Sequence, residues 1–269
     1  GTVARDIPPL AYILGKIFWD GPLTMVLKKR RNIPSITSGG LDTVAVRVPS
    51  HPIFKKIITL VGIPIAAPSA NLSGKPSPTT VQHVLDDFDG IIPAAVDGGE
   101  CEFGIESTVI SFDSPEIVRI LRPGIITKEK LLPYCKAVMI DSSVCGQPSE
   151  IQSDQTASPG MKYTHYSPKA EIILIDGSFE NFARYVMEHY TPHTYALLSD
   201  KDGESFPFRH ITFGDTYEKN AQNLFKCFRE LDKLGAQTVY IRTPEKHGIG
   251  LALYNRLIRA AGFRQLTVL

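Results

Sequence analysis

The sequence predicts a two-domain α/β protein, in which a strand-rich region is followed by a smaller region built as a Rossmann-like parallel sheet. The chain has 269 residues, and at roughly 150 residues per domain this length favours two domains. Sixteen of the 20 prolines lie within residues 1–160, so the two regions are built differently. Over residues 171–269, short apolar runs alternate with amphipathic stretches of helical length, which is typical of parallel sheets with crossover helices.

The first region contains short apolar and β-branched runs separated by turn residues, which is the pattern of strands. A helix is expected over residues 52–61, because Ile53, Ile57 and Leu60 fall on one helical face. A second helix is expected over residues 79–88. The expected strands are residues 23–28, 43–48, 63–67, 94–97, 107–112 and 117–121.

A polar stretch at residues 141–158 (DSSVCGQPSEIQSDQTAS) has the composition of a linker. We therefore divide the chain into a first domain of residues 1–140, a linker of residues 141–170 and a C-terminal domain of residues 171–269. In the last of these, the expected strands are residues 172–175, 195–198, 238–241 and 266–268, and the expected helices are residues 179–189, 217–234 and 252–261.

Charge and composition argue against several classes of protein. The 29 Lys and Arg residues nearly balance the 28 Asp and Glu residues, so strong direct nucleic-acid binding is not expected. No apolar run approaches the roughly 18 residues that span a bilayer, and no signal peptide is expected at the start. The four cysteines show no Cys-x-x-Cys spacing. A disulfide framework or a metal site is therefore not expected, and a reducing cytoplasm fits best.

The segment PIAAPSANLSGKPSPTT at residues 64–80 is the most informative stretch. It runs from an apolar strand into a loop that carries Ser69, Asn71 and Ser77. Hydroxyl, amide and backbone N–H groups at the end of a strand suit phosphate and ribose oxygens. The same spacing also fits a solvated turn. The loop is not a Walker A motif, because proline follows the glycine and lysine at 74–75.

Two later segments strengthen the case for a ligand site. Residues 97–109 (DGGECEFGIESTV) place Ser107 at the start of a strand behind a glycine-rich approach. Residues 121–124 (LRPG) end a strand with Arg122, whose forked guanidinium can pair with a phosphate. Taken alone, an arginine such as Arg122 more often forms a surface ion pair.

Five ordered segments, together with the linker, resemble a known family. They resemble the YrdC-like domain of threonylcarbamoyl-adenylate synthases, and residues 159–168 (PGMKYTHYSP) resemble the interdomain segment of the two-domain, Sua-type members. The segments are GPLT at 21–24, LDTVAVRVP at 41–49, APSAN at 67–71, GIESTV at 104–109 and LRPG at 121–124. The resemblance implies a twisted mixed sheet in the first domain and a Sua-type α/β domain at the C-terminus.

The resemblance also implies a reaction, in which L-threonine, bicarbonate and ATP give threonylcarbamoyl-adenylate and pyrophosphate. Mg²⁺ is expected to arrive with ATP rather than on a protein site. The product feeds the N6-threonylcarbamoyl modification of adenosine 37 in tRNA, so tRNA-modifying transferase proteins are the expected downstream partners. No covalent intermediate is needed, and no catalytic acid or base is nominated.

By the same resemblance, the expected site consists of binding residues from the first domain and the linker. Independently of the resemblance, the aromatic composition of residues 159–168 predicts a lid over the nucleotide, on which Tyr163 or Tyr166 contacts the ligand and His165 lies near the phosphates. The alternative is that these aromatic residues pack against the C-terminal domain as an ordinary interface. Asn71 is expected to support its loop through side-chain hydrogen bonds to the backbone. The expected ATP contacts are Thr43, Ser69, Ser77, Arg122, Tyr163 and Tyr166, and the expected threonine contacts are Arg47, Ala67 and Ser107. Thr43 and Arg47 share one strand face at a period of two.

Two rival functions are weighed against the synthase. One is a YrdC-like module that binds RNA or a nucleotide without catalysis, and the other is a carbamoyl-adenylate-forming domain of the kind found in hydrogenase maturation. The family's usual opening strand and its basic Lys-x-Arg motif do not occur here, so a partial sequence is expected. Their absence favours the binding module, whereas the linker and the C-terminal domain argue against the carbamoyl-adenylate domain.

Overall fold

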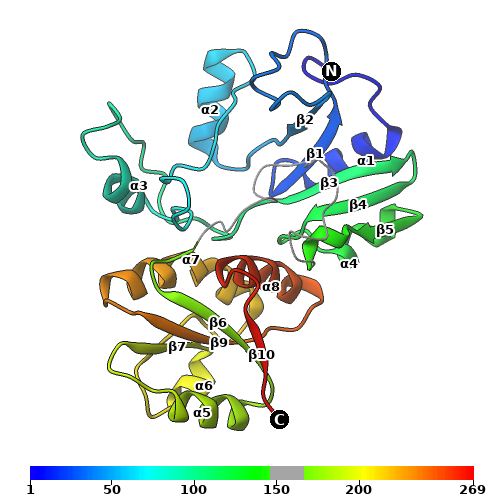
Figure 1. The fold of residues 1–269 in the computed structure, drawn as a ribbon. Helices are drawn as coiled ribbons and strands as arrows, with labels where there is room; N and C mark the ends of the chain where they lie inside the picture. Colours follow the sequence, from blue (N-terminus) through cyan, green and yellow to red (C-terminus); the bar gives the residue numbers. More distant parts are fainter. Residues whose placement is uncertain (146–166) are drawn as a thin grey trace. The chain divides into compact units, whose positions relative to one another are not determined.

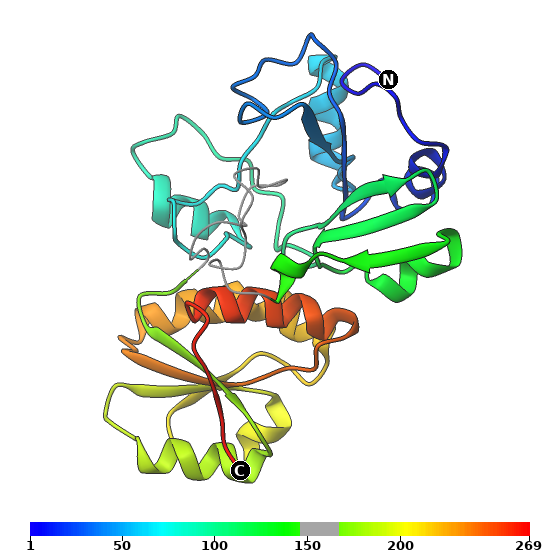
Figure 2. The ribbon, with the colours of Figure 1, turned by 45° about the vertical axis from the view of Figure 1, so that its right-hand side comes forward.

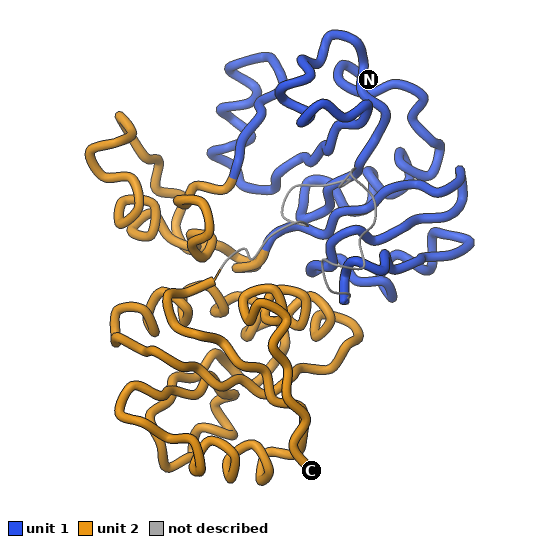
Figure 3. Tube along the Cα trace, in the orientation of Figure 1, with its two compact units in different colours: residues 1–68, 106–162 blue, residues 69–105, 163–269 orange. Residues whose placement is uncertain are grey.

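The structure is a computed structural model of the chain, and it describes residues 1–145 and 167–269. The chain forms two compact units (Figure 3). Unit 1 comprises Gly1–Pro68 and Glu106–Lys162, and unit 2 comprises Ser69–Ile105 and Tyr163–Leu269. Unit 2 thus takes in residues 69–105, which stand within the first region of the sequence. No helix in the described parts of the chain is long and apolar enough to cross a membrane.

Unit 1 is built on a five-stranded mixed sheet with the strand order β2-β1-β3-β4-β5 (Figure 1). The strands are β1 (Leu23–Lys28), β2 (Thr43–Val46), β3 (Thr108–Ser114), β4 (Ile117–Arg122) and β5 (Ala137–Ile140). β1 pairs antiparallel with β2 and parallel with β3, while β4 pairs antiparallel with β3 and parallel with β5. This arrangement confirms the mixed sheet expected for the first region.

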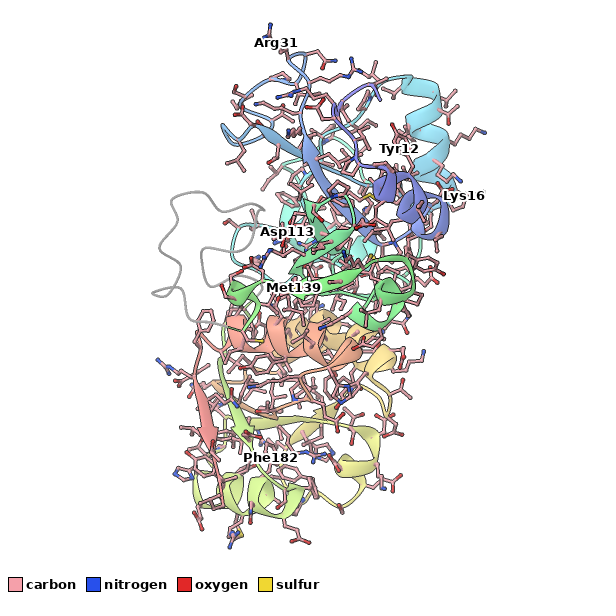
Figure 4. The ribbon with its side chains drawn as sticks, turned by 90° about the vertical axis from the view of Figure 1, so that its right-hand side faces the viewer. Tyr12, Lys16, Arg31, Asp113, Met139 and Phe182 are labelled. Atoms are coloured by element: carbon pink, nitrogen blue, oxygen red, sulfur yellow. The ribbon has the colours of Figure 1, made fainter. Side chains whose placement is uncertain are left out.

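The core of unit 1 lies between this sheet and two helices, α1 (Pro9–Phe18) and α4 (Lys128–Leu131). Leu14 of α1 is fully buried, whereas Tyr12 is 63% exposed on the outer face of the same helix (Figure 4). Pro9 begins α1, where its missing N–H costs no hydrogen bond. The helix α2 (Pro52–Val61) ends at Gly62 in a left-handed conformation, which glycine adopts without strain. The described part of unit 1 also contains two 3₁₀ turns, η1 (Leu132–Tyr134) and η2 (Ser142–Val144).

Unit 2 contains a five-stranded sheet in which every pair of neighbouring strands is parallel, with the order β10-β6-β9-β7-β8. Helices α5 and α6 cover one face, and α7 and α8 cover the other (Figures 1 and 2). This confirms the Rossmann-like sheet. The elements are β6 (Glu171–Asp176), α5 (Phe179–Glu188), β7 (Thr194–Leu198), α6 (Asp200–Glu204), β8 (His210–Thr212), α7 (Tyr217–Lys233), β9 (Thr238–Arg242), α8 (Gly248–Ala260) and β10 (Gln265–Thr267).

Local sequence accounts for several of these elements. Ser178, Ser199 and Thr216 each accept a hydrogen bond from the backbone N–H three residues ahead, which caps α5, α6 and α7. On the α5 face of the sheet, the fully buried Phe182 (labelled in Figure 4) lies 6.0 Å from Phe206 between ring centroids. Caps and apolar periodicity therefore explain why these helices begin where they do.

Two expected strands are wrong. Residues 63–67 and 94–97 form no strand, and Ile63 is 65% and Val96 67% exposed. Neither segment pairs with a strand of the described chain, and a strand needs a partner for its backbone hydrogen bonds. The helix expected over 79–88 forms as α3 (Val81–Phe88), with Thr80 as its cap.

The helix expected over 252–261 begins earlier than expected, at Gly248. The sequence patterns did not identify the helices α1, α4 and α6 or the strands β5 and β8.

Candidate functional site

Two of the expected motifs meet at the start of β3, where Ser107 is joined to Thr24 and Arg122. The Thr24 Oγ1 and Ser107 Oγ atoms lie 2.7 Å apart. Arg122 donates to the Ser107 carbonyl oxygen from Nε at 3.1 Å and from Nη2 at 3.0 Å, and Nη2 lies 3.3 Å from Ser107 Oγ. This end of the sheet therefore carries two hydroxyls and one guanidinium in direct contact.

Sheet register explains why these residues meet. Thr108 pairs with Leu23 in the parallel β1/β3 ladder, and Val109 pairs with Arg122 in the antiparallel β3/β4 ladder. The start of β1, the start of β3 and the end of β4 therefore lie at the same end of the sheet. Ser107 precedes Thr108, and Thr24 follows Leu23.

The turn after Arg122 is pinned to β3 by the neighbouring threonine. The fully buried Thr108 donates through Oγ1 to the Ile126 carbonyl oxygen at 2.8 Å and accepts from the Ile126 N–H at 3.1 Å. Gly124 packs so closely that a Cβ there would lie 2.6 Å from the Thr108 backbone nitrogen. The ESTV and LRPG segments thus form one hydrogen-bonded unit, which holds the Arg122 guanidinium in place.

The hydroxyl groups of Thr24 and Ser107 together can offer a hydrogen bond to a bound ligand. Ser107 is 4% exposed, so its polar atoms are held away from bulk water. When Ser107 donates to Thr24, the hydroxyl hydrogen of Thr24 is left to donate to a bound oxygen. Beside a guanidinium, such a donor suits a carboxylate or a phosphate.

Arg47 lies close to this end of the sheet, and Thr43 lies away from it. Met25 pairs with Val46, so the residue after β2 lies beside the start of β1. Desolvation by burial lowers the pKa of the Arg47 guanidinium. Thr43 pairs with Lys28 at the other end of β1. Arg47 thus lies at the end of the sheet that carries Thr24, Ser107 and Arg122, and Thr43 lies at the opposite end of β1.

The remaining expected loop residues divide between the two units. Ala67 is an exposed residue of unit 1, whereas Ser69, Asn71 and Ser77 belong to unit 2. Asn71 donates through Nδ2 to the carbonyl oxygens of Leu72 and Lys75, both at 3.0 Å. Ser69 is exposed, and Ser77 is 7% exposed.

The residues expected to form a lid, Tyr163, His165 and Tyr166, lie outside the described residues. Within the described ranges, His, Cys, Asp and Glu side chains nowhere gather in threes closely enough to hold a metal ion.

The sequence patterns did not single out Thr24, which the structure joins to Ser107. It stands in the GPLT segment, but a single threonine at the start of a strand carries no chemical signature of its own. Its role depends on Ser107, which is 83 positions away and reaches it only through the parallel pairing of β1 and β3. The presence of Thr24 within one of the ordered segments was the signal that could have identified it.

Two family models match the chain. One is described as Telomere recombination and matches residues 1–124, and the other is described as Threonylcarbamoyl-AMP synthase, C-terminal domain, and matches residues 126–262. Three curated relatives share the name threonylcarbamoyl-AMP synthase. The Pyrococcus abyssi protein is 41% identical over 99% of this chain and 78% of its own length. The Bacillus subtilis protein is 37% identical over 96% and 74%, and the Schizosaccharomyces pombe protein is 36% identical over 96% and 68%.

Two solved structures are similar to this chain over nearly its whole length. The crystal structure of P. abyssi Sua5 complexed with L-threonine matches with a TM-score of 0.88 and 40% identity, over 100% of this chain and 78% of that one. A structure of P. abyssi Sua5 with two substitutions matches with a TM-score of 0.86 and 39% identity, over 99% and 77%. The similarity thus extends over both units of the chain.

Proposed function

The chain belongs to the threonylcarbamoyl-AMP synthase family, and from this premise we propose that it makes threonylcarbamoyl-AMP from L-threonine, bicarbonate and ATP. The observation that carries the proposal is the 41% identity to a threonylcarbamoyl-AMP synthase over 99% of the chain. The match to a Sua5 structure complexed with L-threonine supports threonine as the amino-acid substrate. Membership makes the protein a transferase, and nucleotidyl transfer is the finer activity that we propose.

The proposed reaction has two bond-forming steps. The threonine amine attacks the carbon of bicarbonate, a C–N bond forms, water leaves and a carbamate results. A carbamate oxygen then attacks the α-phosphorus of ATP, and the bond from that phosphorus to the bridging oxygen breaks. Pyrophosphate leaves with the electron pair. Positioning and charge neutralisation provide most of the rate enhancement in such transfers.

We assign threonine binding to the cluster at the start of β3. The Arg47 guanidinium would pair with the amino-acid carboxylate, while the Ser107 hydroxyl, oriented by Arg122, would accept or donate at the substrate's polar groups. Thr24 joins this group because its hydroxyl touches that of Ser107. Ala67 completes the proposed contacts to threonine.

For ATP, we assign Arg122, Thr43, Ser69 and Ser77, the contacts that the family resemblance implies. Mg²⁺ would come with the nucleotide, because phosphate oxygens are its preferred ligands. The product would pass to tRNA-modifying transferase proteins, as the N6-threonylcarbamoyl modification of tRNA requires. We place this reaction in the cytoplasm.

Pyrophosphate release that requires threonine tests the proposal. Purified protein is incubated with ATP, Mg²⁺ and bicarbonate, with and without L-threonine, and the nucleotide product is identified by mass spectrometry. We expect pyrophosphate and threonylcarbamoyl-AMP in equal amounts, and neither when threonine is left out. Serine or glycine in place of threonine serves as the control for substrate choice. Nucleotide binding without any pyrophosphate release would instead identify a non-catalytic module.

A further inference from the structure

The segment of residues 69–105 is attached to the C-terminal part of the chain within unit 2 (Figure 3). One face of helix α7 makes most of the attachment, and the Ser167 N–H adds a hydrogen bond to the Gly74 carbonyl oxygen at 3.2 Å. Its contacting residues are spaced by four, three and four positions, so they form one stripe along the helix. The stripe consists of Gln222, Lys226, Arg229 and Lys233, which contact Cys101, Glu100, Asp87 and Asp86 respectively.

Arg229 is the buried centre of this stripe. It is 8% exposed, and the Asp87 side chain that it faces is 1% exposed. The guanidinium donates to both carboxylate oxygens of Asp87, from Nη2 at 2.8 Å and from Nη1 at 3.3 Å. The same Nη2 donates to the Pro76 carbonyl oxygen at 2.7 Å. One side chain of α7 thus holds both α3, through Asp87, and the loop of residues 69–80, through Pro76.

The contacts continue from Pro76 into the loop. Lys75 reaches Asp87 with its Nζ at 2.9 Å. The Lys75 carbonyl oxygen accepts from Asn71 Nδ2 at 3.0 Å. Ser77, a proposed ATP contact, follows Pro76 directly and is 7% exposed. Because Arg229 donates to the Pro76 carbonyl oxygen, it fixes the position of the backbone that leads into Ser77.

Electrostatics favour a permanently charged pair. Burial by itself would raise the pKa of Asp87, but the hydrogen bonds from Arg229 and Lys75 outweigh it and hold the pKa at about 2. Burial also lowers the pKa of the neighbouring His83, and the positive charge of Arg229 lowers it further.

We propose that Arg229 is a positioning residue for nucleotide binding, which it serves by fixing the loop of residues 69–80 through Asp87 and the Pro76 carbonyl oxygen. This inference rests on the proposed function, because it takes Ser69 and Ser77 as ATP contacts. A buried ion pair often contributes no more stability than an apolar pair of similar volume. A forked donor that meets a carboxylate and a backbone carbonyl fixes geometry in a way that an apolar side chain cannot.

An apolar double variant separates positioning from folding. Asp87→Leu/Arg229→Met removes both charges together, so neither is left buried alone, and unit 2 is expected to stay folded. We expect its KM for ATP to rise by about tenfold, with the KM for threonine unchanged, because loosening a support of binding residues costs affinity on this scale. The matched control is Lys233→Gln, which removes an exposed ion pair between the same two helices. The control is expected to leave both KM values unchanged.

A second measurement does not depend on activity. Hydrogen exchange of the backbone amides in residues 69–80, measured without substrates, is expected to be faster in the double variant than in the wild type and in Lys233→Gln. If the double variant folds and neither the KM for ATP nor this exchange changes, the positioning role is wrong. If exchange rises but the wild type shows no threonine-dependent pyrophosphate release, the proposed function fails while the support of the loop by Arg229 stands.

Discussion

Replacing Thr108 by valine is expected to lower the free energy of unfolding of unit 1 by about 2–4 kcal/mol. Thr108 is fully buried, and its hydroxyl is bonded to both the N–H and the carbonyl oxygen of Ile126. Valine keeps the shape but removes both hydrogen bonds. The two Ile126 groups are then left without a partner in a residue that is 8% exposed, at a cost of about 1–2 kcal/mol each.

Trp19 provides the assay, because it is the only tryptophan in the chain and lies in unit 1. Its indole N–H donates at 2.8 Å to the carbonyl oxygen of Leu23, the first residue of β1 and the residue that pairs with Thr108. Urea unfolding followed by the fluorescence of Trp19 therefore reports on unit 1. The shift of the midpoint, multiplied by the slope, gives the change in free energy.

Thr108→Ser is the matched control. Serine keeps the hydroxyl and loses one buried methyl group, which costs about 1 kcal/mol. The valine variant should therefore be clearly less stable than the serine variant. Equal stability of the two, or greater stability of the valine variant, would refute the reasoning, since the hydroxyl of Thr108 would then contribute nothing beyond its volume.

Three other predictions concern the proposed contacts, the buried carboxylate and the buried thiol. Arg47→Ala should raise the KM for threonine with little change in the KM for ATP. Arg122→Ala should weaken ATP binding more than threonine binding, by about 1.5–3 kcal/mol. Calorimetry with each ligand tests both assignments, and equal losses of both ligands in both variants would contradict them. The pKa of Asp87 is lowered from 3.8 to about 2. The ionised carboxylate therefore stabilises unit 2 by about 2 kcal/mol above pH 4, and this stabilisation is lost as the pH falls through 2. Calorimetric unfolding between pH 5 and pH 2 should show that loss in the wild type and not in Asp87→Asn. Burial raises the pKa of Cys227 to about 12, so iodoacetamide at pH 8 should leave it unmodified in the native protein, and rapid native labelling found by mass spectrometry would contradict its burial.

Patterns within short stretches of sequence were enough to predict much of the fold. Alternating strand and helix patterns predicted the parallel sheet of the C-terminal region, and α7 forms within one residue of the expected bounds of 217–234. The segments that contain Ser107 and Arg122 were expected to serve one site, and the structure brings these two residues into contact. The strand and helix patterns depend on neighbours two to four positions apart, so the local sequence contains that information. The contact between Ser107 and Arg122 joins residues 15 positions apart and depends on the pairing of β3 with β4.

Only the tertiary structure decided the features that join distant segments. Residues 63–67 have the composition of a buried strand, yet they form none, because a strand also needs a partner for its backbone hydrogen bonds. Thr24 meets Ser107 across 83 positions, and Asp87 meets Arg229 across 142. In each case the individual residue types are common at protein surfaces. Their roles arise from the strand pairing and helix packing that bring them together, because burial strengthens a charge pair or hydroxyl pair only once the surrounding chain has excluded water.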